Sequence, residues 1–179
     1  TNSGVDKVYK LDGNCNILEN ATTGDYPSGI TTDGSFLYTV NVDDGNLTKV
    51  DPVTMDATNI DIGKTGTDQI AVPTYSKGTN GTSNSLYISS VNGVIEVELP
   101  NYTTTTLVDL GGAMGYTTSN ENYVLTSIGV GVTAYLIPKN NPSSYSTLSV
   151  VGANGVAIND STAYVGGGGP DAGINLFDM

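Results

Sequence analysis

Several residue types that carry much of enzyme chemistry are missing from this chain. It has no His, no Arg and no Trp, and Cys15 is its only cysteine. Without imidazole the chain can build neither a Ser-His-Asp nor a Cys-His relay, and it has no neutral base near pH 7. Without Arg it lacks the forked cation that binds carboxylates and phosphates through two hydrogen bonds. A single cysteine can form neither an internal disulfide nor a two-cysteine metal site.

Basic charge and long apolar runs are also scarce. Six lysines stand against 18 acidic residues, so the formal net charge is −12. Nucleic acids and anionic membranes require a basic surface, and the sequence therefore predicts neither as a partner. No apolar run approaches the ~18 residues of a membrane helix, so no membrane insertion is expected. The first residues show no leader pattern, which leaves a cytosolic chain or one whose leader has been removed.

What the chain does have is a repeat of about forty residues. Each unit holds a short strand that ends in a turn, an aromatic and β-branched strand, a strand that ends in an apolar residue and Asp, and a closing strand. The second strand type recurs at residues 36–41, 85–90, 122–127 and 162–167. Turn residues between the strands and the absence of helical periodicity predict an all-β fold, a β-propeller of four-stranded antiparallel blades. Such blades pack radially because one sheet cannot bury both of its faces alone.

The repeat predicts a single propeller domain over residues 1–179, with about four repeat units. The expected division is a partial blade at 1–26, blades at 27–67, 68–112 and 113–152, and a partial blade at 153–179. Strands from both termini can close a small ring by completing one blade, and we expect this closure because rings remove exposed edges. Alternatively, the chain is a piece of a larger propeller, or it pairs edge to edge with a second copy.

One part of the chain resembles a known repeat. Residues 27–29 read Pro-Ser-Gly, 33–34 form an Asp-Gly turn, 38–41 read Tyr-Thr-Val-Asn, and 50–54 read Val-Asp-Pro-Val-Thr. This pattern is similar to the YVTN repeat of YVTN/NHL-type β-propellers, and the other units keep it without the same letters. Related repeats occur in archaeal surface-layer proteins, lactonase-like enzymes and NHL-type binding propellers. The resemblance implies the fold, whereas no position matches the metal or acid-base motif of the lactonase-like enzymes.

Polar residues are concentrated in the turns between second and third strands and in the connections between blades. In a propeller these segments lie on one rim, where acidic and amide side chains suit a cation, an amine or sugar hydroxyls. Asp43 and Asp44 are predicted metal contacts, because oxygen ligands in a tight glycine turn suit Ca²⁺; an ordinary Asp-Gly hairpin is the alternative. No catalytic residue and no other cofactor is predicted. The predicted ligand-binding residues are Asn41, Asp43, Asp44, Asp68, Gln69, Asn92 and Asp171.

Three further patterns carry structural expectations. Glu96 and Glu98 alternate on one strand, and we expect them on a solvated outer face. Tyr38, Tyr87 and Tyr164 occupy one column of the repeat and are expected to pack between blades. Residues 73–84 are expected to form a long polar loop.

The sequence favours a non-catalytic, secreted or cell-surface propeller that acts as a binding or structural scaffold. Its richness in Thr, Ser, Asn and Gly is typical of microbial surface proteins and supports an extracellular location. The expected partners are a protein, a glycan, or another copy of the chain through edge strands. One alternative is a divalent-metal-dependent lactonase-like hydrolase, in which Asp43, Asp44 and Asp68 would hold the ion. Another is a segment of a repetitive surface-layer or filament protein.

Overall fold

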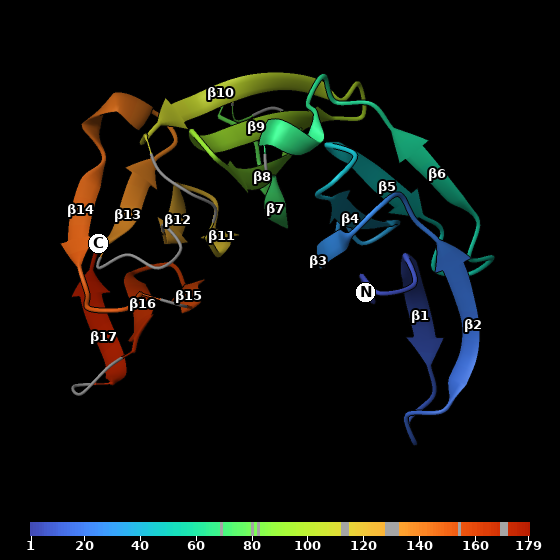
Figure 1. The fold of residues 1–179 in the computed structure, drawn as a ribbon. Helices are drawn as coiled ribbons and strands as arrows, with labels where there is room; N and C mark the ends of the chain where they lie inside the picture. The colour runs from blue at the N-terminus through green and yellow to red at the C-terminus, as the bar shows by residue number, and fades with distance from the viewer. Residues whose placement is uncertain are drawn as a thin grey trace.

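In the residues that it describes, the computed structural model has antiparallel β-sheets and two short 3-10 helices (Figure 1). It describes residues 1–68, 70–79, 81, 83–111, 115–127, 133–153, 155–168 and 172–179. Within these residues no helix is long and apolar enough to cross a membrane.

The strands form five sheets, each a meander in which neighbours in sequence pair. The first sheet has two strands, β1 (Lys7–Leu11) and β2 (Ile17–Thr22). The next is made of β3 (Pro27–Thr32), β4 (Leu37–Asn41), β5 (Asn46–Val50) and β6 (Ala57–Ile60). After η1 (Gly66–Asp68) come β7 (Ala71–Lys77), β8 (Asn84–Ser90), β9 (Gly93–Leu99) and β10 (Thr103–Asp109).

The fourth sheet has β11 (Thr117–Ser119), β12 (Tyr123–Ser127), β13 (Thr133–Pro138) and, after η2 (Pro142–Ser144), β14 (Ser146–Ser149). The fifth has β15 (Gly155–Ile158), β16 (Thr162–Gly167) and β17 (Gly173–Asp178).

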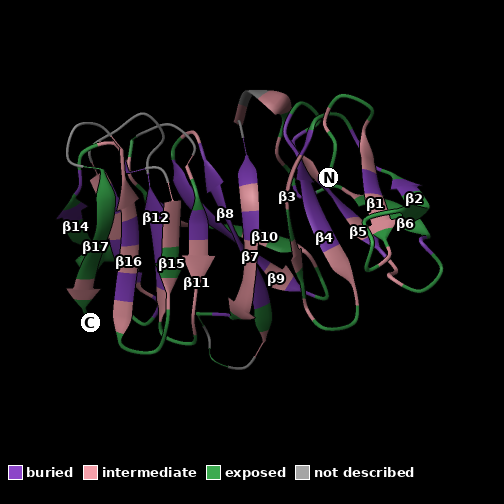
Figure 2. Cartoon of the chain, turned by 90° about the horizontal axis from the view of Figure 1, so that it is seen from below, coloured by how far each residue is buried: buried purple, intermediate pink, exposed green. Residues whose placement is uncertain are grey.

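Each contact between neighbouring sheets is an apolar cluster. Val8 of the first sheet packs with Val50 of the second, and Leu47 of the second packs with Leu86 of the third. Two further clusters join the third sheet to the fourth and the fourth to the fifth. Because side chains alternate between the faces of a strand, Tyr38 faces one neighbouring sheet and Leu37 the other. The inner strands of the complete sheets are therefore buried on both faces, as Figure 2 shows for β8.

The five sheets form an open arc rather than a closed ring (Figure 1). Strands β3, β7, β11 and β15 lie on its inner side, and the β1–β2 sheet and the β15–β17 sheet lie at opposite ends. The expected closure of one blade by strands from both termini is therefore wrong for the described residues, since these terminal strands belong to two separate sheets. Five sheets of this curvature cover only part of a circle.

The expected long loop at residues 73–84 is also wrong. Residues 73–77 belong to β7, in which Pro73 pairs with Ile88 and Tyr75 with Leu86. The connection between β7 and β8 is thus confined to residues 78–83. The β-forming residues Thr74 and Tyr75 favour the strand more than the neighbouring polar residues oppose it, whereas Val72 is the bulge residue, with φ of +41°.

Candidate functional site

The predicted rim is present, and it brings together turns from successive sheets (Figure 2). The β4–β5 turn touches η1, because a Cβ atom on Gly66 would lie 2.2 Å from the carbonyl oxygen of Asp43. The carbonyl oxygen of Asp68 accepts a 3.0 Å hydrogen bond from the N–H of Val91, which precedes Asn92 in the β8–β9 turn. The structure therefore places Asp43, Asp68 and Asn92 in adjoining turns of one rim. Gln69 and Asp171 lie outside the described residues.

The predicted rim residues differ in how accessible they are. Asp43, Asp44 and Asn92 are exposed, whereas Asn41 is fully buried at the end of β4. The Nδ2 of Asn41 donates to the Thr48 hydroxyl at 2.8 Å, and its Oδ1 is buried without a partner among the described residues. Asp68 Oδ2 accepts from the N–H of Thr65 at 2.8 Å and so shapes its own loop. Asp43 and Asp44 are thus more exposed than Asp68, the other carboxylate of the predicted set that the structure describes.

Two carboxylates that the sequence analysis did not select lie beside Asp43 and Asp44. Asp44 Oδ2 accepts a 2.9 Å hydrogen bond from the N–H of Asp25, and Asp6 Oδ1 accepts one of 3.1 Å from the N–H of Tyr26. The negative charge of Asp6 is the main cause that raises the pKa of Asp25, with smaller contributions from burial, Asp44 and Asp43. We call Asp6, Asp25, Asp43 and Asp44 the acidic corner. Only their positions in space reveal it, because they come from three separate segments.

The acidic corner does not amount to a metal site in the described part of the chain. No three carboxylate, thiol or imidazole groups among the described residues come close enough to hold one ion. Ca²⁺ favours six to eight oxygen ligands. Side-chain carboxylates alone do not supply such a set here, and Ca²⁺ binding at Asp43 and Asp44 stays a prediction that a calcium titration of the melting temperature can test.

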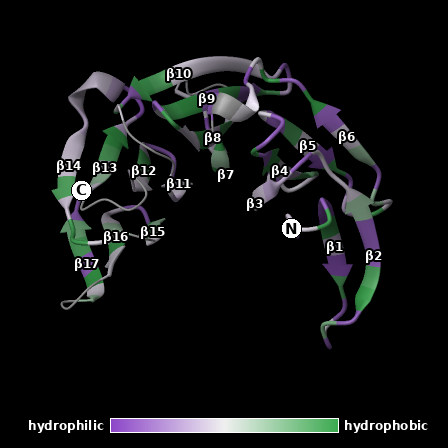
Figure 3. Ribbon diagram, in the orientation of Figure 1, coloured by the Kyte–Doolittle hydropathy of each residue, from purple (hydrophilic) through white to green (hydrophobic). Residues whose placement is uncertain are grey.

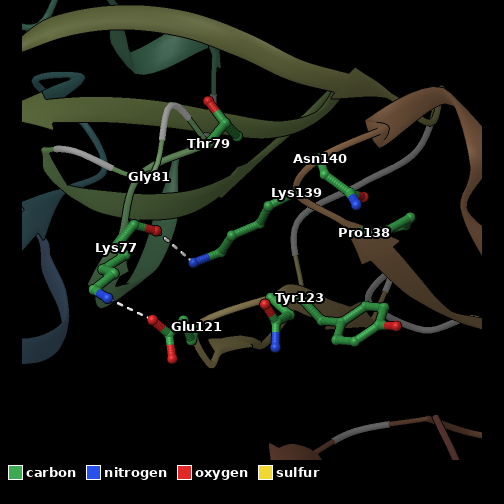
Figure 4. A pocket seen from close by; sticks show the side chains of 10 residues that line it. Lys77, Thr79, Gly81, Glu121, Tyr123, Pro138, Lys139 and Asn140 are labelled. Atoms are coloured by element: carbon green, nitrogen blue, oxygen red, sulfur yellow. Dashed lines mark hydrogen bonds and ion pairs between the residues drawn. The ribbon is translucent and has the colours of Figure 1, made fainter.

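A second polar cluster lies between the third and fourth sheets (Figure 4). Its centre is Lys139, which follows β13 and is only 4% exposed. The ammonium group donates to Ser76 Oγ (2.6 Å), the Lys77 carbonyl (2.6 Å) and the Asn120 carbonyl (2.7 Å). These bonds use all three of its protons. Nζ also lies 4.4 Å from the ring centroid of Tyr87, so Lys139 ties the two sheets together.

Glu96 provides the negative charge of this cluster, and the expectation that it lies on a solvated face is wrong. It is 7% exposed, and Val94 on the same face of β9 packs in a cluster with Val124 of the fourth sheet. It accepts hydrogen bonds from the Thr79 N–H (2.9 Å), the Thr79 hydroxyl (2.8 Å) and the Ser85 hydroxyl (2.8 Å). The Tyr87 hydroxyl lies 3.1 Å from Glu96 Oε1. Glu98, two residues on, is half-buried.

Burial is the largest cause of the pKa shifts of Lys139 and Tyr87 in this cluster. It lowers the pKa of Lys139 to about 8, while the charges of Glu96 and Glu121 act in the opposite direction. Burial and the neighbouring Glu96 raise the pKa of the Tyr87 hydroxyl. The lysine is thus a cation that the fold holds in place at some electrostatic cost.

A pocket of about 360 Å³ opens beside Lys139. Glu121 on its wall forms an ion pair with Lys77. Because Lys77 and Lys139 both have partners inside the protein, the remaining polar groups of the pocket can offer hydrogen bonds but no unpaired cation. The pocket is lined by Lys77, Gly78, Thr79, Gly81, Glu121, Asn122, Tyr123, Pro138, Lys139 and Asn140.

The tyrosine column packs between sheets as predicted, at least at Tyr38 and Tyr87. Tyr38 is 2% exposed and joins the cluster between the second and third sheets, and Tyr87 is fully buried between the third and fourth. Tyr164 is half-buried, and its hydroxyl lies 3.2 Å from Asn159 Nδ2.

Because of this burial, we expect Tyr38 and Tyr87 not to ionise in an alkaline titration of the folded protein. Burial raises the pKa of Tyr38, as do its hydrogen bond to Asp33 and the neighbouring Tyr102, and burial with Glu96 does the same for Tyr87. Of the eleven tyrosines, we expect these two to stay protonated near pH 10, where exposed tyrosines ionise. Absorbance of the folded protein should therefore show the same titration step in wild type, Tyr38→Phe and Tyr87→Phe. A smaller step in either folded variant would contradict this.

The comparisons with known proteins show the fold. No family model matches the chain, and no curated protein matches its sequence. BamB from Moraxella catarrhalis superposes with a TM-score of 0.67 at 10% identity, over 98% of this chain and 54% of that one. U3-55K superposes with a TM-score of 0.72 at 13% identity, over 97% of this chain and 55% of that one. The chain therefore has the predicted β-propeller fold and spans about half the length of both proteins.

Proposed function

We propose that this chain is a non-catalytic binding scaffold that presents the acidic corner of its rim to a protein partner with basic side chains. The propeller fold supports this proposal, since such rims hold many turns on a rigid frame. The absence of His and Arg from the sequence supports a binding role over catalysis. The YVTN-like pattern at residues 27–54 supports placing the chain among YVTN/NHL-type propellers, and its composition supports a secreted or cell-surface location.

The observation that carries the proposal is the crowding of carboxylates beside an exposed aromatic ring. Asp25, Asp43 and Asp44 are exposed, and the charges of its acidic neighbours raise the pKa of Asp25. Tyr26, the next residue, is 51% exposed. A basic side chain from a partner would relieve the repulsion between the carboxylates, and it could stack on the tyrosine ring.

An oligolysine peptide is a suitable probe of the acidic corner. We expect the triple variant Asp25→Asn/Asp43→Asn/Asp44→Asn to bind it roughly tenfold more weakly, since each exposed ion pair contributes up to about 1 kcal/mol. The matched control is Asp61→Asn/Asp109→Asn/Asp160→Asn, which removes the same charge from exposed positions elsewhere. Isothermal titration calorimetry at two salt concentrations measures both, and binding of the wild type should weaken as salt rises.

Equal losses in the two triple variants would show that only net charge matters and would overturn the role of the acidic corner. Binding of neutral oligosaccharides, with no response to oligolysine, would favour the glycan partner instead. In both cases circular dichroism checks that the variants keep their β-structure.

A further inference from the structure

Internal sheets of the arc bury both faces, and β5 shows how. Leu47 is fully buried against the following sheet, where it packs with Leu86 and Ile88. Val50, on the opposite face of the same strand, is fully buried against the preceding sheet, where it packs with Val8. We call the face of a sheet that meets the next sheet along the chain its following face, and the face that meets the sheet before it its preceding face. Every internal contact therefore joins the following face of one sheet to the preceding face of the next.

At the C-terminal end of the arc, the corresponding following face has no neighbour in the described structure. Tyr38 and Tyr164 hold the same position in the repeat, and they pair with Lys49 and Leu176. Leu176 on β17 therefore corresponds to Lys49 on β5. Two residues earlier on the same strand face, Ile174 corresponds to Leu47. Ile174 is 70% exposed and Leu176 is 64% exposed. Phe177 on the other face of β17 packs against the cluster shared with the fourth sheet. Ile174 and Leu176 thus form the C-terminal end face.

At the N-terminal end of the arc, no described sheet packs on the preceding face of the β1–β2 sheet. Leu11 corresponds to Val50, because each is followed by an Asp whose Oδ1 accepts hydrogen bonds from the next turn. Leu11 is 51% exposed, and Ile17, its pairing partner on β2, is 62% exposed. These two residues, with Tyr9, line a hollow of about 640 Å³. Leu11, Ile17 and Tyr9 form the N-terminal end face; Figure 3 shows apolar stretches on β2 and β17.

We propose that these two end faces bind each other between two copies of the chain. The C-terminal end face of one copy packs on the N-terminal end face of the second, and the second copy makes the same contact in return. Two observations favour a second copy as the occupant. The two faces are the same pair that meets at each internal contact, and the chain spans 54% and 55% of the two similar propeller chains. Two copies therefore supply about as many residues as one such chain.

Such a pair is a two-fold assembly in which each contact joins unlike surfaces, so both ends of the arc are covered at once. Each copy carries a net charge of −12, which opposes association. Salt screens this repulsion while apolar contact is retained. We therefore expect dimerisation to strengthen as salt rises, opposite to the salt dependence of oligolysine binding at the acidic corner.

Analytical ultracentrifugation and small-angle X-ray scattering of the full chain test this assembly. The wild type should sediment as two copies with the scattering of a ring, and Leu176→Asp or Ile17→Asp alone should raise the dissociation constant at least roughly tenfold, because each buries a charge. The control is Val53→Asp, which changes a 77% exposed residue outside both end faces and should leave the dimer intact. Thermal unfolding checks that each variant still folds.

Mixing the two end-face variants identifies the contact as one between unlike surfaces. An equimolar mixture of Leu176→Asp and Ile17→Asp retains one unaltered contact per pair and should associate more tightly than either variant alone. The proposal is overturned by a wild type that stays monomeric at every salt concentration, as it would if a different propeller segment covers these faces. It is also overturned by a dimer that neither end-face substitution weakens.

Discussion

Replacing Gly45 with Ala is expected to lower the free energy of unfolding by about 2–4 kcal/mol. Gly45 lies in the β4–β5 turn with φ of +71°, a conformation that costs an L-residue about 1 kcal/mol. The new Cβ would also lie 2.3 to 2.4 Å from three backbone atoms of Thr65, which cannot move like a flexible side chain. Overpacking of this kind typically costs about 1–3 kcal/mol more. Urea unfolding followed by circular dichroism measures the loss.

Gly34→Ala is the matched control for this substitution. Gly34 also has a positive φ, of +92°, but nothing lies within 4 Å of the position that its Cβ would take. We expect it to lose only about 1 kcal/mol, the cost of the backbone conformation. Similar losses in the two variants would show that the β4–β5 turn does not pack on the loop before η1. The rim that positions Asp43 and Asp44 depends on this packing.

The repeat predicted the strands well because their signals are local. The aromatic and β-branched segments at 36–41, 85–90, 122–127 and 162–167 match β4, β8, β12 and β16 to within one residue at each end. Short strands with turns between them need no distant information to be recognised. The packing of Tyr38 and Tyr87 between sheets also followed from their shared position in the repeat.

Features that depend on the neighbouring sheet could not be predicted from local pattern. Glu96 and Glu98 alternate as a solvated strand face would, yet Glu96 is 7% exposed and accepts hydrogen bonds from Thr79 and Ser85. Whether the ends of the chain meet depends on the angle between sheets, which no single repeat reveals. The arc therefore stays open although each unit has the expected strand order.

The residues of the candidate sites were also predictable only where the position of a residue in the repeat determines where it lies. The rim placement of Asp43, Asp44 and Asn92 followed from the strand order, whereas Asp6 and Asp25 joined them only through the first sheet and its connection. Lys139 lies in a segment that reads as an ordinary turn, and its partner Ser76 is 63 residues away in the sequence. Nothing local marks this lysine as buried.

Lys139→Met is expected to destabilise the protein by about 2–3 kcal/mol. Methionine keeps most of the apolar stem but removes three donated hydrogen bonds, and it leaves Ser76 Oγ and the Lys77 and Asn120 carbonyls without this donor. A buried acceptor without a partner costs about 1–3 kcal/mol, part of which is offset because methionine avoids burying a charge. Lys64→Met is the matched control, since Lys64 is a half-buried lysine with no hydrogen bond to the described residues. If Lys139→Met lowers the free energy of unfolding by less than Lys64→Met does, Lys139 does not stabilise the contact between the third and fourth sheets.

The pH dependence of this loss separates a buried cation from a simple packing residue. The pKa of Lys139 falls from 10.5 to about 8 on folding, so between these values the unfolded chain binds more protons than the folded one. Stability contributed by Lys139 therefore rises with pH in this window, because the cost of burying the charge is full below pH 8 and vanishes above 10.5. Tyrosines far from Lys139 affect wild type and Lys139→Met alike, and the contribution of Tyr87, whose ring centroid lies 4.4 Å from Lys139 Nζ, is removed by repeating the comparison in the Tyr87→Phe background. Their difference in unfolding free energy should grow from pH 8 upward, and a constant or shrinking difference would show that Lys139 is not held as a desolvated cation.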